Sequence, residues 1–130
     1  MKRIEDVYDI SAETGVLCTL IQNPDFILHS ETLSPSYFYK KENGAIYWAI
    51  QELYQKGIDK IDEFNIITQI NTNKGVKNII ESYSKDFIKE LVDNSEYVAR
   101  GTKEEYQEIA NRLITLSFKR DTYNKLKYFQ

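Results

Sequence analysis

The sequence contains few of the residues from which catalytic and metal sites are built. Its 130 residues include one cysteine, Cys18, and one histidine, His29. The sequence therefore lacks the residues needed for a disulfide framework, a zinc site, or Cys-His or Ser-His catalysis. His29 fits an ordinary surface or capping histidine. The five glycines stand apart from one another, which excludes the glycine-rich phosphate loops. We expect no catalytic residue, no metal site and no cofactor.

Long hydrophobic runs are also missing. No stretch approaches eighteen consecutive apolar residues, and the first residues lack the apolar run of a signal peptide. Cys18 stands alone inside an apolar helical pattern, where a small buried hydrophobe is its expected role. Because no disulfide framework is possible, the composition is typical of an intracellular protein. We expect a soluble, cytoplasmic chain without membrane contact.

The net charge of the chain is small, but the charged residues are unevenly distributed along it. A net charge of −3 argues against a general nucleic-acid binder, which usually carries a clear basic excess. From Arg112 to Gln130, five cations accompany one anion, a local +4, whereas residues 1–111 carry −7. A basic end on an acidic body suggests a polar contact surface. A solvated helix face is an equally good interpretation.

What the chain does contain is helical periodicity, interrupted by only two prolines. We expect helices over about 11–22 and 42–56, the second ending at Gly57. Pro24 and the pair Ser34-Pro35 each fit the start of a short helix. Alternation typical of strands is absent beyond a few residues. The predicted fold class is all-α, a compact orthogonal bundle of about six helices.

Signals in the second half of the chain place further helices. Asp62 fits the cap of a helix whose Phe64, Ile67 and Ile70 we expect to pack inward. Another short helix is indicated around residues 79–80. A helix opening near residue 84 should end at the polar stretch 93–95.

A long last helix is predicted from Thr102 onward. Thr102 and Glu105 form a capping-box pattern, and neither glycine nor proline follows Gly101. An unbroken helix to Gln130 would be roughly 42 Å long. Its apolar stripe covers the first half and then turns polar, so the second half should leave the body as an arm. The stripe comprises Tyr106, Ile109, Ala110, Leu113 and Ser117. We expect a globular helical head at residues 1–101 and, at 102–130, a long helix that packs on the head and then extends.

The stretch from Pro35 to Gly57 holds six of the seventeen aromatic residues. On a helical wheel, most apolar residues of 42–56 share one broad arc, which predicts a core face rather than a platform for stacking bases. The residues assigned to the core are Tyr37, Phe38, Ile46, Ile50 and Leu53. Trp48 lies on the polar side of the same helix. Another element covers it, or it anchors a partner.

The order of these features resembles the N-terminal domain of DnaB-type replicative DNA helicases over about residues 10 to 125. In that family a Phe-Tyr pair precedes a helix of this period, which closes on Lys/Arg-Gly and then Ile-Asp. The residues that carry the resemblance here are Phe38-Tyr39, Ile46-Tyr47, Ala49-Ile50, Leu53-Tyr54, Lys56-Gly57, Ile61-Asp62 and Ile66-Ile67. They are joined by Ala12-Glu13, Val16-Leu17, Leu20 and Asn23 at the start, and by Tyr106, Ile109 and Arg112 near the end. Departures include Cys18, Lys41 and Asn43, where the family often has glycine, proline and histidine, as in a diverged phage or mobile-element version.

The resemblance implies a non-catalytic, all-helical head that sits ahead of a RecA-like ATPase ring. In the family this head self-associates into a collar and offers a docking surface to primase and loader proteins. Its long helix continues into a helical hairpin, so residues 102–130 would be the first arm of that hairpin, truncated, with no ATPase domain present. The parent would be an ATP-dependent helicase that acts in DNA replication, and contact with DNA would occur only through the assembled parent.

Assembly and partner docking is therefore the leading hypothesis, with self-association as a dimer or higher oligomer and with primase or a helicase loader as partner. The expected interface residues are Phe118, Tyr123, Leu126 and Phe129 along the arm, Lys119, Arg120, Lys125 and Lys127 as a basic rim, and Trp48. A frayed helix end is the simpler interpretation of the arm. Two other functions stay open: a small helical DNA-binding regulator, and a stand-alone phage protein that binds a host helicase or primase.

Overall fold

The computed structural model describes residues 7–83 and 86–128, except for the side chains of residues 127 and 128. Helices are the only regular secondary structure in these residues, so the predicted all-α class is confirmed. Six are α-helices and two are 3-10 helices: α1 (Ile10–Gln22), η2 (Pro24–His29), η3 (Pro35–Tyr37), α2 (Lys41–Gln55), α3 (Glu63–Ile70), α4 (Lys74–Glu81), α5 (Phe87–Val98) and α6 (Lys103–Tyr128).

Local sequence signals set several helix ends as predicted. At the start of α3, the Asp62 carboxylate accepts a hydrogen bond from the Asn65 N–H at 2.8 Å. At the start of α6, the Thr102 hydroxyl accepts one from the Glu105 N–H at 3.1 Å. Gly57 follows α2 with a φ of 80°, which glycine adopts without steric cost. These ends depend on nearby residues alone, which is why the sequence reveals them.

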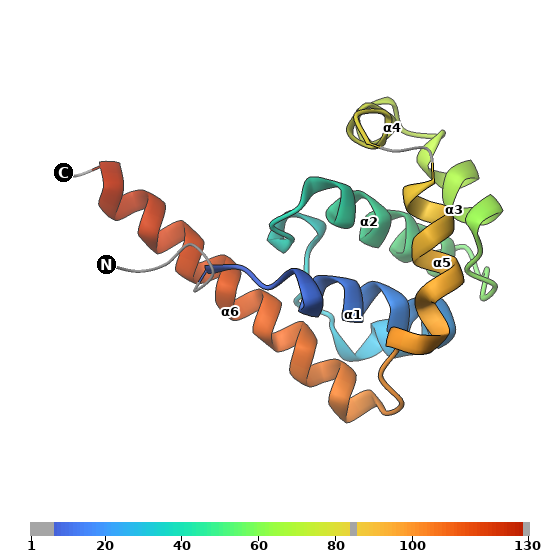
Figure 1. The fold of residues 1–130 in the computed structure, drawn as a ribbon, viewed down its shortest axis with the longest axis horizontal. Helices are drawn as coiled ribbons and strands as arrows, with labels where there is room; N and C mark the ends of the chain where they lie inside the picture. The colour runs from blue at the N-terminus through green and yellow to red at the C-terminus, as the bar shows by residue number, and fades with distance from the viewer. Residues whose placement is uncertain (1–6, 84–85, 129–130) are drawn as a thin grey trace.

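Helix α1 lies at the centre of the molecule. Figure 1 shows it between α2 and α6, with α5 crossing its C-terminal end, and it contacts all three of these helices and η2. Every residue from Gly15 to Ile21 is buried. The helix is therefore covered all round rather than packed along one stripe, as expected for a core helix. The lone cysteine, Cys18, is fully buried within it.

The aromatic stretch contributes to the core, as its periodicity predicted. Phe38, Ile46, Ile50 and Leu53 are buried, and Tyr37 is half-buried against them. The ring centroid of Phe38 lies 5.1 Å from that of the buried Tyr47. Most of these aromatic side chains are thus unavailable for stacking on bases.

The inward face of α3 differs from the prediction. Phe64 is 74% exposed and Ile67 is also exposed, whereas Ile66 and Ile70 are buried. Helix α3 packs mainly on α2, with further contacts to α4 and α5. The side chains four residues apart, Ile66 and Ile70, meet the core, and Phe64 points away from it. The expectation for Phe64 and Ile67 is therefore wrong, and that for Ile70 is correct.

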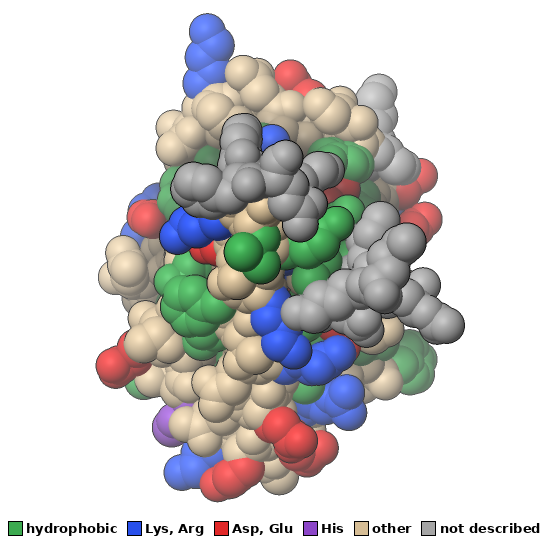
Figure 2. Space-filling view, turned by 90° about the vertical axis from the view of Figure 1, so that its left-hand side faces the viewer, with side chains coloured by type: hydrophobic (Ala, Val, Ile, Leu, Met, Phe, Trp, Pro, Cys, Tyr) green, Lys and Arg blue, Asp and Glu red, His purple; other side chains and the backbone are tan. Residues whose placement is uncertain are grey.

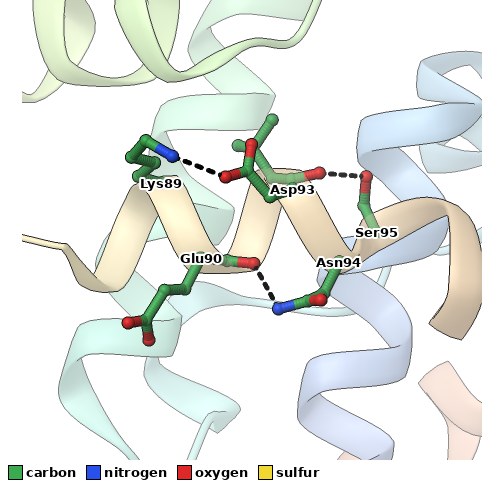
Figure 3. A network of polar contacts seen from close by, with 6 residues as sticks. Lys89, Glu90, Asp93, Asn94 and Ser95 are labelled. Atoms are coloured by element: carbon green, nitrogen blue, oxygen red, sulfur yellow. Dashed lines mark hydrogen bonds and ion pairs between the residues drawn. The ribbon is translucent and has the colours of Figure 1, made fainter.

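The polar stretch 93–95 does not end a helix, as Figure 3 shows. Each of its side chains bonds within α5. Lys89 pairs with Asp93 at 2.8 Å, and the Asn94 amide donates to the Glu90 carbonyl at 2.9 Å. The Ser95 hydroxyl donates to the carbonyl three residues earlier at 2.7 Å. These polar side chains are satisfied by their own helix, so the predicted break is wrong.

Candidate assembly surface on the long helix

Helix α6 packs on the head through its first half and projects beyond it. Its 26 residues span roughly 39 Å. The buried positions are Tyr106, Ala110, Leu113, Leu116 and Ser117. From Phe118 to Leu126, every side chain except Arg120 is exposed. Figure 1 shows this second half extending past the other helices.

A buried cluster of hydroxyl groups anchors the base of α6. The Tyr106 hydroxyl lies 2.7 Å from the Ser30 hydroxyl, which in turn lies 3.3 Å from the Tyr47 hydroxyl. Burial raises the pKa of Tyr106 and of Tyr47, so both phenols stay neutral. The cluster joins α6 to α2 and to the end of η2, where Ser30 also donates to the Ile27 carbonyl at 3.1 Å.

An ion pair on the surface ties α6 to the start of α1. The Arg112 guanidinium donates to one Asp9 carboxylate oxygen at 2.6 Å. The other carboxylate oxygen caps α1 by accepting from the Ala12 N–H at 2.9 Å. The hydrogen bond from Arg112 lowers the pKa of Asp9 most, and burial opposes that shift. One of the cations in the basic end is therefore engaged within the molecule.

Arg120 joins α6 to the head close to the point where the exposed half of the helix begins. Two of its guanidinium nitrogens donate to backbone carbonyls, that of Val7 at 2.7 Å and that of Tyr37 at 2.6 Å. The guanidinium carbon also lies 5.6 Å from the ring centroid of Tyr39. The sequence placed Arg120 in the basic rim of the arm. The structure instead directs its side chain toward the head, because 3.6-residue periodicity brings position 120 back to the buried side of α6.

The opposite side of the projecting half is apolar and largely exposed. Phe118 is 58% exposed, Leu126 is 60% exposed and Tyr123 is also exposed. With Thr115, Lys119 and Thr122 they line one shallow hollow, built from α6 alone. We call these six residues the outer face of α6. Figure 2 views the end of the molecule from which α6 projects, and shows hydrophobic and Lys/Arg side chains lying next to one another there.

The expected interface residues on α6 differ in how exposed they are. Lys119 and Lys125 are exposed on the projecting half. The Lys127 side chain and Phe129 lie outside the described residues. Phe118 is partly held by the head, since its ring centroid lies 6.0 Å from that of Tyr37.

Trp48 is half-buried and packs against the core. With Val76 and Ile79 of α4, it lines a hollow of about 400 Å³ between α2, α4 and the segment around η3. Trp48 therefore packs partly on the core and partly faces this hollow, beside α4. This placement favours the first of the two interpretations drawn from the sequence, a tryptophan covered by another element.

Sequence reasoning assigned no structural role to Glu13. Its side chain is fully buried in α1 and accepts hydrogen bonds from the Tyr39 N–H at 2.7 Å, the Lys40 N–H at 3.3 Å and the Asn43 amide at 3.0 Å. Its carboxylate thus caps α2 from another helix. One feature of the sequence could have indicated this role of Glu13. The cap position of α2 is Lys40, whose side chain cannot accept a hydrogen bond.

Within the described residues, no group of three or more His, Cys, Asp or Glu side chains is placed to hold a metal ion. None of the helices described is long and apolar enough to cross a membrane. The Cys18 sulfur lies 4.0 Å from the Leu91 carbonyl, and burial raises the pKa of this thiol to about 11. His29 is exposed at the end of η2.

The fold and the surface together define an all-helical domain with a projecting helix whose outer face is apolar. Residues 5–112 match the model of the DnaB-like helicase N-terminal domain, so the chain belongs to that family. The family is a non-catalytic domain of helicases that act in DNA replication, and its members take part in oligomerisation and in contacts with helicase loaders or primase. No curated protein and no solved structure matched the chain. The matched residues include α6 only as far as Arg112, so the whole outer face of α6 lies beyond them.

Proposed function

We propose that this chain is the assembly and partner-docking domain of a replicative DNA helicase. It associates with further copies of itself in a collar and offers a surface to primase or a helicase loader. Residues 1–101 form the head, and residues 102–130 form the first arm of a helical hairpin. A separate part of the parent protein binds and hydrolyses ATP, and the domain meets DNA only within that assembly.

The observation that carries this proposal is the outer face of α6. Phe118, Tyr123 and Leu126 expose apolar surface at helical spacing, on the side opposite to the packed stripe of Tyr106, Ala110 and Leu113. Neighbouring exposed apolar side chains on the side of a helix away from its packed stripe mark a contact surface. Apolar side chains in a row with lysines at their flanks are also the arrangement of paired helices, where the flanking charges set the choice of partner.

Charge along α6 favours a second copy of the chain as one occupant of this face. The first turns carry exposed Glu104, Glu105 and Glu108, whereas the projecting half carries exposed Lys119 and Lys125. Two α6 helices that pair antiparallel place the acidic half of each opposite the basic half of the other. A parallel pairing would set like charges side by side.

Sedimentation equilibrium on two double variants tests the proposal. Phe118→Glu/Leu126→Glu places charge on the outer face and should yield a monomer with unchanged helicity. Phe64→Glu/Ile67→Glu, the matched control, charges the exposed apolar residues of α3 and should associate as the wild type does. If the wild type associates and both variants behave alike, or if the wild type is monomeric, the outer face of α6 is not the self-association surface.

The DNA-binding regulator is a weaker candidate because two cations of the basic end are occupied. Arg112 pairs with Asp9, and Arg120 binds two carbonyls within the molecule. Direct phosphate binding predicts an affinity for DNA that falls steeply with salt concentration. Fluorescence anisotropy at several salt concentrations, with labelled duplex and single-stranded DNA, separates the two functions: the assembly domain should show no such binding. Inhibition of a heterologous helicase ring by the chain would instead favour a phage protein that acts on a host helicase.

A further inference from the structure

Arg120 occupies a position where two separate segments of the chain, residues 7–8 and 37–39, meet α6. Its two carbonyl acceptors belong to Val7, in the segment before α1, and to Tyr37, at the end of η3. The ring of Tyr39 lies against its guanidinium and also stacks on Tyr8, with 4.3 Å between ring centroids and 12° between planes. No other side chain from position 118 to 126 is withdrawn from solvent.

The surroundings of Arg120 are themselves held in place. The Tyr39 N–H donates to the buried Glu13 carboxylate at 2.7 Å, which fixes the backbone at the point where the ring leaves it. Burial lowers the pKa of Arg120, and the charge of Glu13 opposes that effect. A guanidinium keeps its charge under these conditions because its ordinary pKa is far above neutrality. The guanidinium thus contacts a segment whose own backbone is held in place by Glu13.

We propose that Arg120 is the positioning residue that sets the direction of the projecting half of α6. Beyond position 120 every described side chain of α6 is exposed, and a solvated helical segment of this length is marginal by itself. The planar guanidinium places two different nitrogens against two carbonyls while its face meets a ring. A lysine has a single donor nitrogen and cannot reproduce this arrangement. Only the consequence of this inference rests on the proposed function: the outer face is presented to a second copy at one defined angle.

The test measures arm direction in the monomer, so it does not depend on whether the chain self-associates. Spin labels are attached at Glu90→Cys on α5 and Asn124→Cys on α6, both at exposed positions. The native Cys18 is fully buried and stays unlabelled. The distribution of distances between the two labels is recorded by pulsed electron spin resonance, at concentrations where sedimentation shows a monomer.

Arg120→Lys should widen the distance distribution by about twofold or more, because the projecting half is then released. Lys119→Ala, the matched control at an exposed neighbouring position, should leave it unchanged. A distribution in Arg120→Lys that equals the wild type would overturn the proposal. Protection of Cys18 from a disulfide reagent reports whether the head is intact. If Arg120→Lys exposes Cys18, the same distance is measured in Tyr39→Leu, which keeps both carbonyl acceptors: widening supports the proposal and an unchanged distribution rejects it.

Discussion

Replacing Glu13 by alanine should lower the free energy of unfolding by about 2–4 kcal/mol. The carboxylate is fully buried and accepts from two backbone N–H groups, those of Tyr39 and Lys40, and from the Asn43 amide. The two N–H groups belong to the N-cap residue of α2 and to the residue before it, and Lys40 itself offers no side-chain cap. Alanine therefore removes the only side-chain acceptor that the structure provides for these donors.

The magnitude follows from opposing contributions. Each of the three donors left without a partner costs about 1–3 kcal/mol, and water that reaches the partly buried ones recovers some of this. Loss of a negative charge beside the N-terminus of α2 costs a further 0.3–1 kcal/mol or so. Against these, the variant no longer desolvates a carboxylate, which offsets several kcal/mol. The net effect stays destabilising because the donors remain while their acceptor is gone.

Urea denaturation followed by far-ultraviolet circular dichroism measures this change. Glu31→Ala, at an exposed position between η2 and η3, is the matched control and should stay within about 0.5 kcal/mol of the wild type. Glu13→Gln keeps one acceptor oxygen and should fall between the two. A Glu13→Ala variant as stable as the control would show that the cap on α2 contributes nothing, and the reasoning from hydrogen bonding would be wrong.

Three other predictions concern the anchors of α6 and the core. Tyr106→Phe removes the hydroxyl that bonds Ser30 and should cost about 1–2 kcal/mol in urea denaturation, with little further loss when Ser30→Ala is added. Because the folded pKa of Asp9 lies below its ordinary value of 3.8, its pairing with Arg112 stabilises the fold above that pH and is lost as the pH falls through the lower folded value. Asp9→Asn should accordingly flatten the dependence of Tm on pH below about pH 4, and an unchanged slope would contradict the pairing. Cys18, with its pKa raised from 9.0 to about 11, should react with a disulfide reagent at least ~100-fold more slowly in the native chain than in urea. A native rate equal to the unfolded one would mean that α1 is not buried.

The parts of the fold that were predictable from sequence depend on neighbouring residues. Asp62, Thr102 and Gly57 act within one turn of the helix ends that they mark, so their residue types alone carry the information. The same holds for the helical period of apolar positions along 42–56, which placed Ile46, Ile50 and Leu53 in the core. The order of these local signals was also sufficient to indicate the helicase family.

Predictions failed where two local patterns were equally consistent with the residues. In α3, one apolar stripe runs through Phe64, Ile67 and Ile70 and another through Ile66 and Ile70, and only the position of α2 selects the second. The polar stretch 93–95 has turn-like composition, yet its side chains also bond within a helix. Contact of α5 with α1, including the bond from Gln22 to Ser95 at 2.7 Å, decides between them.

The sequence by itself determined the helical class, most helix ends, the buried face of α2 and the family to which the chain belongs. Only the tertiary structure decided that Glu13 caps a helix other than its own, and that Arg120 faces the head while Phe118 and Leu126 face outward. The physical reason is the range of the interactions. Caps and periodicity act over three or four residues, whereas these contacts join positions from 26 to 113 residues apart, which come together only when the chain is folded.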